Sequence, residues 1–271
     1  MSARWRFPWS TTLGAFTVVI GLGAFLHARL GHSETCAFSP HHAGLAFPVE
    51  RIDPEWACRL EAIIDHYTTA TTVGPFRVAL PKSMYLYLLD RPPFAAALIN
   101  RLDLGLYKSE ARGPGRFWGY DGEGTEGIVQ LVYQDPTSRI YFLEGSHDSR
   151  LLPHITGKAV VFLRMNSVRD ANRMDAMDST MVSYTKLDNR ILSGLVSLLR
   201  PLIGGTVTRK LRKGMETVNR LGQMMRQHPD RVLFEAMDPP ALPDDDVAFL
   251  KEALGSLQKP GNASHQKTPT P

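Results

Sequence analysis

Residues 105–145 read GLYKSEARGPGRFWGYDGEGTEGIVQLVYQDPTSRIYFLEG, and this stretch decides the fold. Short runs of aromatic and aliphatic residues alternate in it with turn sequences such as Gly-Pro-Gly and Asp-Pro-Thr-Ser, a pattern typical of antiparallel hairpins. Similar runs continue further along the chain. Together they predict six successive strands, at residues 105–111, 116–122, 127–134, 139–145, 158–165 and 180–187. The charged residues 166–179 are predicted to form a solvated loop between the last two strands.

A long basic amphipathic helix is predicted directly after the strands, over residues 190–227. Its first part, residues 191–203, is nearly apolar, and Pro201 with the pair Gly204-Gly205 predicts a hinge or a bend. Eight Lys or Arg residues and one acid, Glu216, lie in the helix. Two interpretations stay open, a solvated outer face and a face that meets anionic lipid. The residues predicted to face a membrane are Leu195, Leu198, Leu199, Arg209, Lys210 and Lys213.

Shorter elements are predicted on either side of this core. Asp53-Pro54 is a helix-start sequence, and the helix that follows is expected to end near Thr71. A short strand at residues 75–80 then precedes helical pieces at residues 84–89 and 93–102. Residues 244–257 are predicted to be helical, and the polar residues 258–271 to form a disordered tail.

This order of elements resembles the helix-grip fold of START domains, Bet v 1-like allergens and polyketide cyclases. The match covers residues 74–227 and is one of topology and hydrophobic pattern, so it carries over no functional residue. The predicted fold class is α+β, with a curved antiparallel sheet of about seven strands wrapped on a long C-terminal helix and an extra N-terminal helix. The resemblance implies an internal cavity for a lipid, sterol, polyketide or other bulky apolar ligand.

One hairpin predicts which side chains line such a cavity. If residues 135–138 form its loop, Tyr133 lies opposite Ile140, and the pairs that follow step along both strands by two residues. The side chains on this face are apolar except for one carboxylate. The predicted cavity lining is Val129, Leu131, Tyr133, Ile140, Phe142 and Glu144.

The role of that carboxylate is open in the sequence. Glu144 could hold a polar ligand head group, lie near the rim, or form a salt bridge with Arg164 or Lys186. An enzyme of the cyclase or hydrolase type would need a general acid or base in the cavity. The available candidates are Glu144, His147, His154, Tyr133 and Tyr184, which form no constellation defined by spacing, so no catalytic residue is predicted.

The N-terminal residues are not expected to belong to the fold. Arg4 and Arg6 precede an uncharged apolar run at residues 12–26, which is short for a membrane span and suits the apolar part of a secretory signal. A removed signal peptide and an uncleaved membrane anchor both stay open. Either one predicts an exported protein that is periplasmic, anchored in the inner membrane or secreted.

Cys36 and Cys58 are the only cysteines of the chain. An oxidising compartment would let them pair, and the disulfide would stabilise the fold by about 3 kcal/mol in the chain-entropy model. Two unrelated buried thiols are the alternative. The histidines near Cys36 lack regular ligand spacing, so no metal site is predicted.

Composition is ordinary for a globular protein, with 43% hydrophobic and 21% charged residues. The formal net charge of +4 falls by two without Arg4 and Arg6, which gives no argument for a nucleic-acid partner. The leading functional prediction is an exported, membrane-associated protein that binds or transfers a lipid or other bulky apolar ligand, without a cofactor. The alternatives are a cyclase- or hydrolase-like enzyme acting in the same cavity, and a structural or interaction protein whose cavity is filled by side chains.

The predicted organisation has five parts. They are a signal peptide or anchor at residues 1–30, a connector with an amphipathic helix at 31–73, a ligand-binding domain at 74–227, a C-terminal extension at 228–257 and the tail at 258–271. The expected partners are a lipid or apolar small molecule and a membrane surface.

Overall fold

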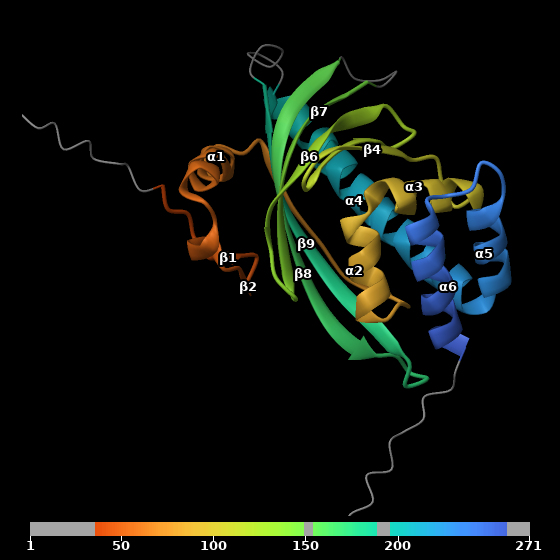
Figure 1. The fold of residues 1–271 in the computed structure, drawn as a ribbon. Coiled ribbons are helices and arrows are strands. Elements are labelled where there is room, and N and C mark those ends of the chain that lie inside the picture. The colour runs from red at the N-terminus through yellow and green to blue at the C-terminus, as the bar shows by residue number, and fades with distance from the viewer. Residues whose placement is uncertain (1–35, 149–153, 189–195, 259–271) are drawn as a thin grey trace, which may run out of the picture. The chain divides into compact units, whose positions relative to one another are not determined.

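The computed structural model describes residues 36–148, 154–188 and 196–258, which lie in one compact unit. The predicted leader and the predicted C-terminal tail lie outside the described residues. A seven-stranded antiparallel sheet with the order β3-β9-β8-β7-β6-β5-β4 is its centre (Figure 1). The strands are β3 (Thr69–Val78), β4 (Lys108–Gly113), β5 (Arg116–Tyr120), β6 (Thr125–Gln134), β7 (Ser138–His147), β8 (Ile155–Arg169) and β9 (Asp175–Leu187).

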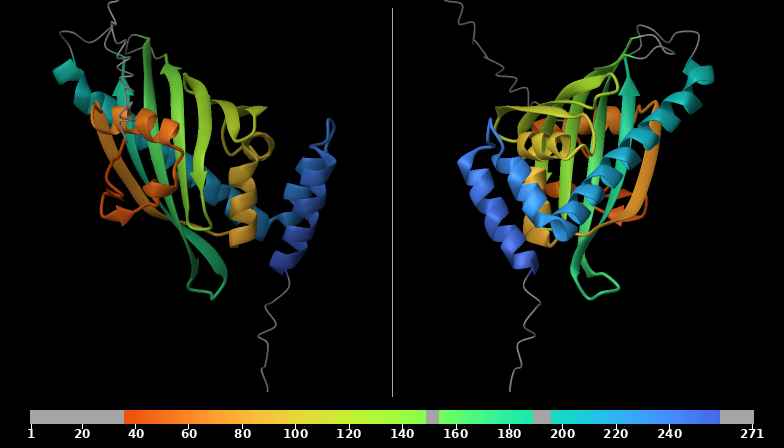
Figure 2. Two further views of the ribbon diagram at one scale, coloured as in Figure 1. Left: turned by 60° about the vertical axis from the view of Figure 1, so that its left-hand side comes forward. Right: turned by 90° about the vertical axis from the view of Figure 1, so that its right-hand side faces the viewer.

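Helices and one small sheet cover the two faces of this sheet. The long helix α4 crosses one face, as the right-hand view of Figure 2 shows, and we call this the inner face. The opposite, outer face carries α1 and the small sheet. The bounds are β1 (His41–His42), β2 (Leu45–Ala46), α1 (Pro54–Ile64), α2 (Lys82–Asp90), α3 (Pro92–Arg101), α4 (Val196–Gln227), α5 (Pro229–Met237) and α6 (Asp244–Gln258), with a 3-10 turn at Val49–Arg51. This is the predicted helix-grip layout of the α+β class, with one sheet gripping one long helix.

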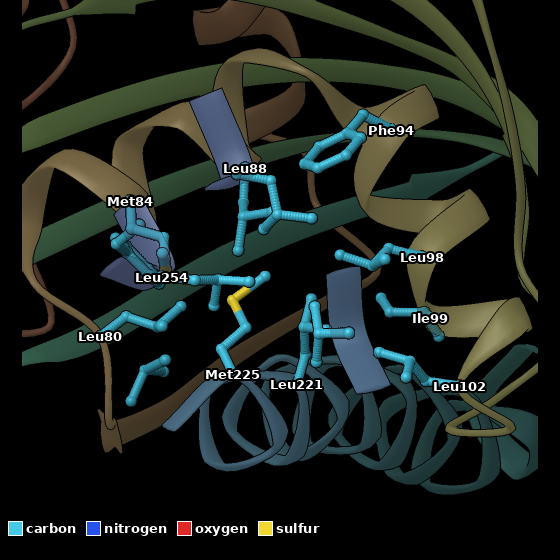
Figure 3. Packing of buried hydrophobic residues seen from close by; sticks show 14 of the residues in the cluster. Leu80, Met84, Leu88, Phe94, Leu98, Ile99, Leu102, Leu221, Met225 and Leu254 are labelled. Carbon is cyan, nitrogen blue, oxygen red and sulfur yellow. The ribbon is translucent and has the colours of Figure 1, made fainter. Parts of the chain in front are cut away.

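The inner core fills one half of the inner face. Buried side chains of α2 and α3 meet α4 and the ends of β3, β8 and β9, and α5 and α6 close the same cluster from outside. Figure 3 shows Leu221 and Met225 of α4 pointing toward Leu80, Leu98 and their neighbours. Burial of this apolar surface is what holds α4 against the sheet.

The outer core lies on the other face, where α1 and residues 38–52 cover β7, β8 and β9. Asp53 accepts a hydrogen bond from the Glu55 N–H at the start of α1, which confirms the predicted helix start. The predicted disulfide is present, with Cys36 and Cys58 bonded and their Cα atoms 4.8 Å apart. It ties the beginning of the described chain to α1.

Three predicted elements differ from the structure. The charged stretch 166–179 is not a long loop, because the β8–β9 ladder continues to the pair Arg169 and Asp175. Only residues 170–174 turn, around the Asp170 carboxylate, which accepts hydrogen bonds from the N–H groups of Asn172 and Met174. The buried Met177 explains this, since one face of the extended ladder packs in the inner core.

The helix predicted to run on to Thr71 ends at Ile64, and β3 begins at Thr69 because its β-branched residues favour a strand. Conversely, α4 is one helix across Pro201 and the glycine pair. A Cβ on Gly204 would stand 2.9 Å from the Thr69 hydroxyl oxygen. Close packing of α4 on β3 therefore accounts for this glycine, and no break is present.

Candidate functional site between the sheet and helix α4

The β6–β7 hairpin divides the predicted cavity lining between the two faces. Tyr133 pairs with Ile140 as predicted, but a bulge at Val132 then shifts the register, so that Leu131 pairs with Tyr141. Side chains that are paired across strands share a face. The prediction of one common face is therefore wrong, because one extra residue in β6 reverses the alternation beyond it.

The predicted lining residues on the outer face pack against other side chains of the protein. Ile140 and Phe142 are buried in the outer core, and Tyr133 packs against the same cluster. Glu144, on the same face of β7, lies 3.4 Å from the Lys158 ammonium, and both side chains are about half exposed. Glu144 therefore forms a salt bridge at the surface and not in the interior, and its partner is Lys158 in place of the predicted Arg164 or Lys186.

The inner part of the set, Val129 and Leu131, lies on the face that α4 crosses. Val129 pairs with Phe117 on β5 and with Leu143 on β7, which gives an apolar row on the inner face. These three side chains and Leu131 are partly exposed, and among the described residues they belong to none of the packed clusters. We call Phe117, Val129, Leu131 and Leu143 the open apolar row. It differs from the opposite half of the same face, where the inner core is filled.

A row of glycines crosses the sheet beside the open apolar row. Gly127 pairs with Gly119 and with Gly145, and Gly145 pairs with Gly157, so four adjacent strands carry glycine at one level. A Cβ on Gly127 would lie 2.5 Å from the Glu144 carbonyl oxygen and 2.7 Å from the Gly145 Cα. At Gly127, Gly145 and Gly157 the strands therefore approach too closely for larger residues, and no side chain projects from the glycine row toward α4.

A buried polar group marks the end of the open apolar row nearest the inner core. The Arg139 side chain is 4% exposed, and its Nη1 atom lies 2.6 Å from Asp90 Oδ1 at the end of α2. Burial lowers the pKa of Arg139, but Asp90 and Tyr141 outweigh it and raise this pKa overall. Burial raises the pKa of Tyr141, against the effect of Arg139. Within the described residues the Arg139 Nε atom, also buried, has no hydrogen-bond partner.

An ion-pair cluster joins α4 to the β5–β6 turn at the other end. Lys210 Nζ lies 2.5 Å from Asp121 Oδ2, and Lys213 Nζ lies 2.5 Å from Glu123 Oε1. Burial raises the pKa of Asp121, but hydrogen bonds from Lys210 and from backbone N–H groups lower it overall. For Glu123, the hydrogen bond from Lys213 is the main cause of a lowered pKa. We call these four residues the α4 latch.

The α4 latch corrects part of the predicted membrane-facing set. Lys210 and Lys213 are ion-paired, and Lys210 is only 19% exposed, so neither presents a free charge to an anionic surface. Arg209 is exposed on the same helix. Leu195 lies outside the described residues, as do the side chains of Leu198 and Leu199.

The candidate acids and bases are not brought together. His147 is placed toward α4, where burial and then the Lys210 charge lower its pKa, and its Nδ1 lies 3.0 Å from the Thr125 hydroxyl. Tyr184 lies on the outer face, 3.0 Å from His42 Nδ1, and His154 pairs with Asp148 at an exposed strand end. The described residues thus show no catalytic constellation built from these candidates.

Sequence reasoning missed the buried Arg139 and the glycine row. No local pattern marks Arg139 as buried, because its partner Asp90 is remote in sequence. The glycines had a detectable signal. Each of them, at positions 119, 127, 145 and 157, falls inside a strand, where glycine indicates close backbone approach.

No protein-family model and no curated protein sequence matches the chain. Solved structures resemble it distantly. They include a conserved protein from Geobacillus kaustophilus (8% identity, TM-score 0.41, covering 57% of this chain and 93% of that one). A second is an uncharacterised protein from Rhizobium leguminosarum (16% identity, TM-score 0.31, covering 56% of this chain and 96% of that one). A third is Ara h 8.0201 (14% identity, TM-score 0.33, covering 57% of this chain and 99% of that one). With TM-scores below 0.5, these likenesses support no statement about function, and the helix-grip layout is assigned from the chain's own topology.

Proposed function

We propose that this protein binds a bulky apolar ligand between the inner face of the sheet and helix α4. The open apolar row carries the proposal, because its four apolar side chains lie on the face that α4 crosses, yet they are neither fully buried nor part of a packed cluster of the described chain. The adjoining glycine row removes the side chains that would otherwise fill this space. Ligand pockets combine such apolar lining with a few placed polar groups. Arg139 and Tyr141 would supply these for a polar end of the ligand.

The proposal is tested with the full chain and a fluorescent fatty acid as probe. Val129→Trp adds a large side chain to the open apolar row, and we expect it to weaken binding at least tenfold. Ile128→Trp is the matched control, since this neighbouring residue of β6 faces the outer side. Equal binding by both variants, or no saturable binding by the unmodified protein, would refute the proposal.

We further propose an exported location with membrane association. A disulfide is typical of oxidising compartments, and the apolar run at residues 12–26 suits a secretory signal. Within the parts that the structure describes, no helix is long and apolar enough to span a membrane. Fractionation of the native host, followed by peptide mapping without reducing agent, tests the location. Recovery in the cytosol with two alkylatable thiols would contradict it.

A further inference from the structure

A second pocket lies on the outer face, on the side of the sheet opposite the open apolar row. Its volume is about 300 Å³, and it lies between α1 and the strands β7, β8 and β9. This is at the small end of the range for ligand pockets. The lining residues are Arg59, Ala62, Ile63, Phe142, Lys158, Lys186 and Asp188. We call it the outer pocket.

Cations dominate the outer pocket. Three of its lining residues carry a positive charge and one, Asp188, a negative charge, so the lining has a net charge of +2. The carboxylate of Asp188 is also engaged, since it accepts a hydrogen bond from the Thr156 hydroxyl at 2.7 Å. A cavity lined by one sign of charge attracts an oppositely charged ligand.

The strand register makes this arrangement costly without a ligand. Lys158 and Lys186 are directly paired across β8 and β9, and like charges in that position repel each other. On β7, Glu144 is the strand partner of Lys158, and its carboxylate lies 3.4 Å from the Lys158 ammonium. This ion pair is about half exposed, so it offsets the Lys158 charge only weakly. Lys186 donates instead to the Ala62 carbonyl at 2.9 Å, and no carboxylate of the described residues lies within 4.0 Å of it. An anion between the two ammonium groups would relieve the repulsion.

Arg59 is positioned by aromatic rings and not by an acid. Its guanidinium carbon lies 4.1 Å from the centre of the Trp56 ring and 4.8 Å from that of Phe142. Across the described chain, no carboxylate forms an ion pair with it. Stacking fixes the plane of the group and leaves its N–H edge for an acceptor, the geometry with which arginine binds phosphate through two hydrogen bonds.

We propose that the outer pocket binds a phosphate monoester whose apolar or aromatic body packs against the apolar part of the pocket lining. The charge of the phosphate dianion matches the net charge of +2 of the lining. Arg59 can donate two parallel hydrogen bonds to it, and the ammonium groups of Lys158 and Lys186 attract it electrostatically. The phosphate belongs either to a soluble metabolite or to a lipid head group. This site is independent of the proposed function, because it lies on the other face of the sheet.

Titration of the full chain with phenyl phosphate tests the site, with Trp56 fluorescence and calorimetry as readouts. We expect saturable binding that weakens as salt rises, weaker binding of inorganic phosphate, and none of phenol. Lys186→Gln and Arg59→Gln should each weaken binding at least tenfold. Arg112→Gln, on the far edge strand β4, is the control and should bind as the unmodified protein does.

Vesicles identify the source of the phosphate. Binding to vesicles that contain phosphatidic acid, lost in Lys186→Gln and competed by phenyl phosphate, would assign a lipid head group, and binding of the soluble probe alone would assign a soluble ester. Circular dichroism shows whether each variant is folded. If Arg59→Gln disturbs α1, Lys186→Gln still tests the site, because it changes a strand residue and leaves the backbone pairing of β8 and β9 intact. Equal affinity for phenyl phosphate in the unmodified protein and folded Lys186→Gln, or no saturable binding, would overturn the proposal.

Discussion

Single residues decide how closely the strands approach and which groups stay uncharged. Gly145 sits where a Cβ would lie 2.9 Å from the Gly127 Cα and closer still to the Glu126 carbonyl oxygen. These neighbours are backbone atoms, which cannot move aside as a flexible side chain can. The sheet therefore requires glycine at positions 127, 145 and 157, whereas a Cβ on Gly119 would meet only an ordinary contact at 3.8 Å.

Gly145→Ala should lower the free energy of unfolding by about 1–3 kcal/mol, the usual cost of overpacking. Gly205→Ala is the control, because a Cβ there meets no atom within 4 Å and alanine favours a helix by up to about 1 kcal/mol. Urea unfolding measures both changes. A Gly145→Ala variant as stable as the unmodified protein would contradict the close approach of β6 and β7.

His42 should make stability depend on pH. Its ring is 3% exposed and stacks on Phe162 with 4.1 Å between ring centres, and burial is the main cause of its lowered pKa. The unfolded chain therefore binds the proton more readily, so stability is full above the unfolded pKa of about 6.5 and declines as pH falls below it. Urea unfolding at several pH values should show a smaller decline for His42→Phe than for His41→Phe, a change at the exposed neighbour. The same decline in both variants would show that His42 is not responsible.

At the scale of elements, one link holds the parts of the outer layer together and a second attaches α4 to the sheet. The disulfide holds the segment that carries Phe38 and Phe47 against α1, and these two side chains are buried in the outer core. The α4 latch holds α4 to the β5–β6 turn across the end of the open apolar row. Each link joins elements that are remote in sequence.

The double variant Cys36→Ser/Cys58→Ser should lose about 3 kcal/mol in the free energy of unfolding. Closure of the loop restricts the unfolded chain, so the loss should appear as a lower midpoint in urea. Reduction of the unmodified protein should reproduce it. An unchanged midpoint in both cases would mean that the outer layer does not depend on the disulfide.

Lys210→Gln should destabilise the protein by about 1 kcal/mol or less at neutral pH, since the pair is only partly shielded from solvent. The carboxyl pKa values of Asp121 and Glu123 are lowered in the folded state. Their contribution is therefore complete above the unfolded pKa values near about 4 and is lost as pH falls through the folded ones. Thermal unfolding of both proteins should differ at pH 7 and converge in acid. A difference that persists at low pH would exclude the α4 latch as its cause.

At the scale of the molecule, the sheet has two cores back to back. Tyr141 packs toward the inner core, whereas its neighbours Ile140 and Phe142 lie in the outer core. The same backbone supports both clusters. Loss of either cluster should therefore weaken the other, and the described unit should unfold in one step.

Phe162→Ala removes a fully buried ring of the outer core and should cost about 3–5 kcal/mol. Near-ultraviolet and far-ultraviolet circular dichroism should follow one shared transition, at a lower denaturant concentration than in the unmodified protein. Two separated transitions would show that the outer layer unfolds independently of the α4 grip.

The amino-acid sequence by itself determined the order of elements, the fold class and the disulfide. Alternation, turn residues and helix-start signals act over a few neighbouring positions, so strands such as the one ending at Gln134 and the start of α1 at Asp53 could be predicted. The two cysteines left one possible pair.

Only the tertiary structure decided which face each strand residue occupies and which charges are free. The bulge at Val132 moves Leu131 and Tyr133 to opposite faces, and no local pattern marks it. Lys210 reads as a solvated or membrane-facing charge until the β5–β6 turn places Asp121 beside it. Such contacts join residues far apart in the chain, and their energies depend on burial and on packing that exist only once the sheet, α1 and α4 have come together.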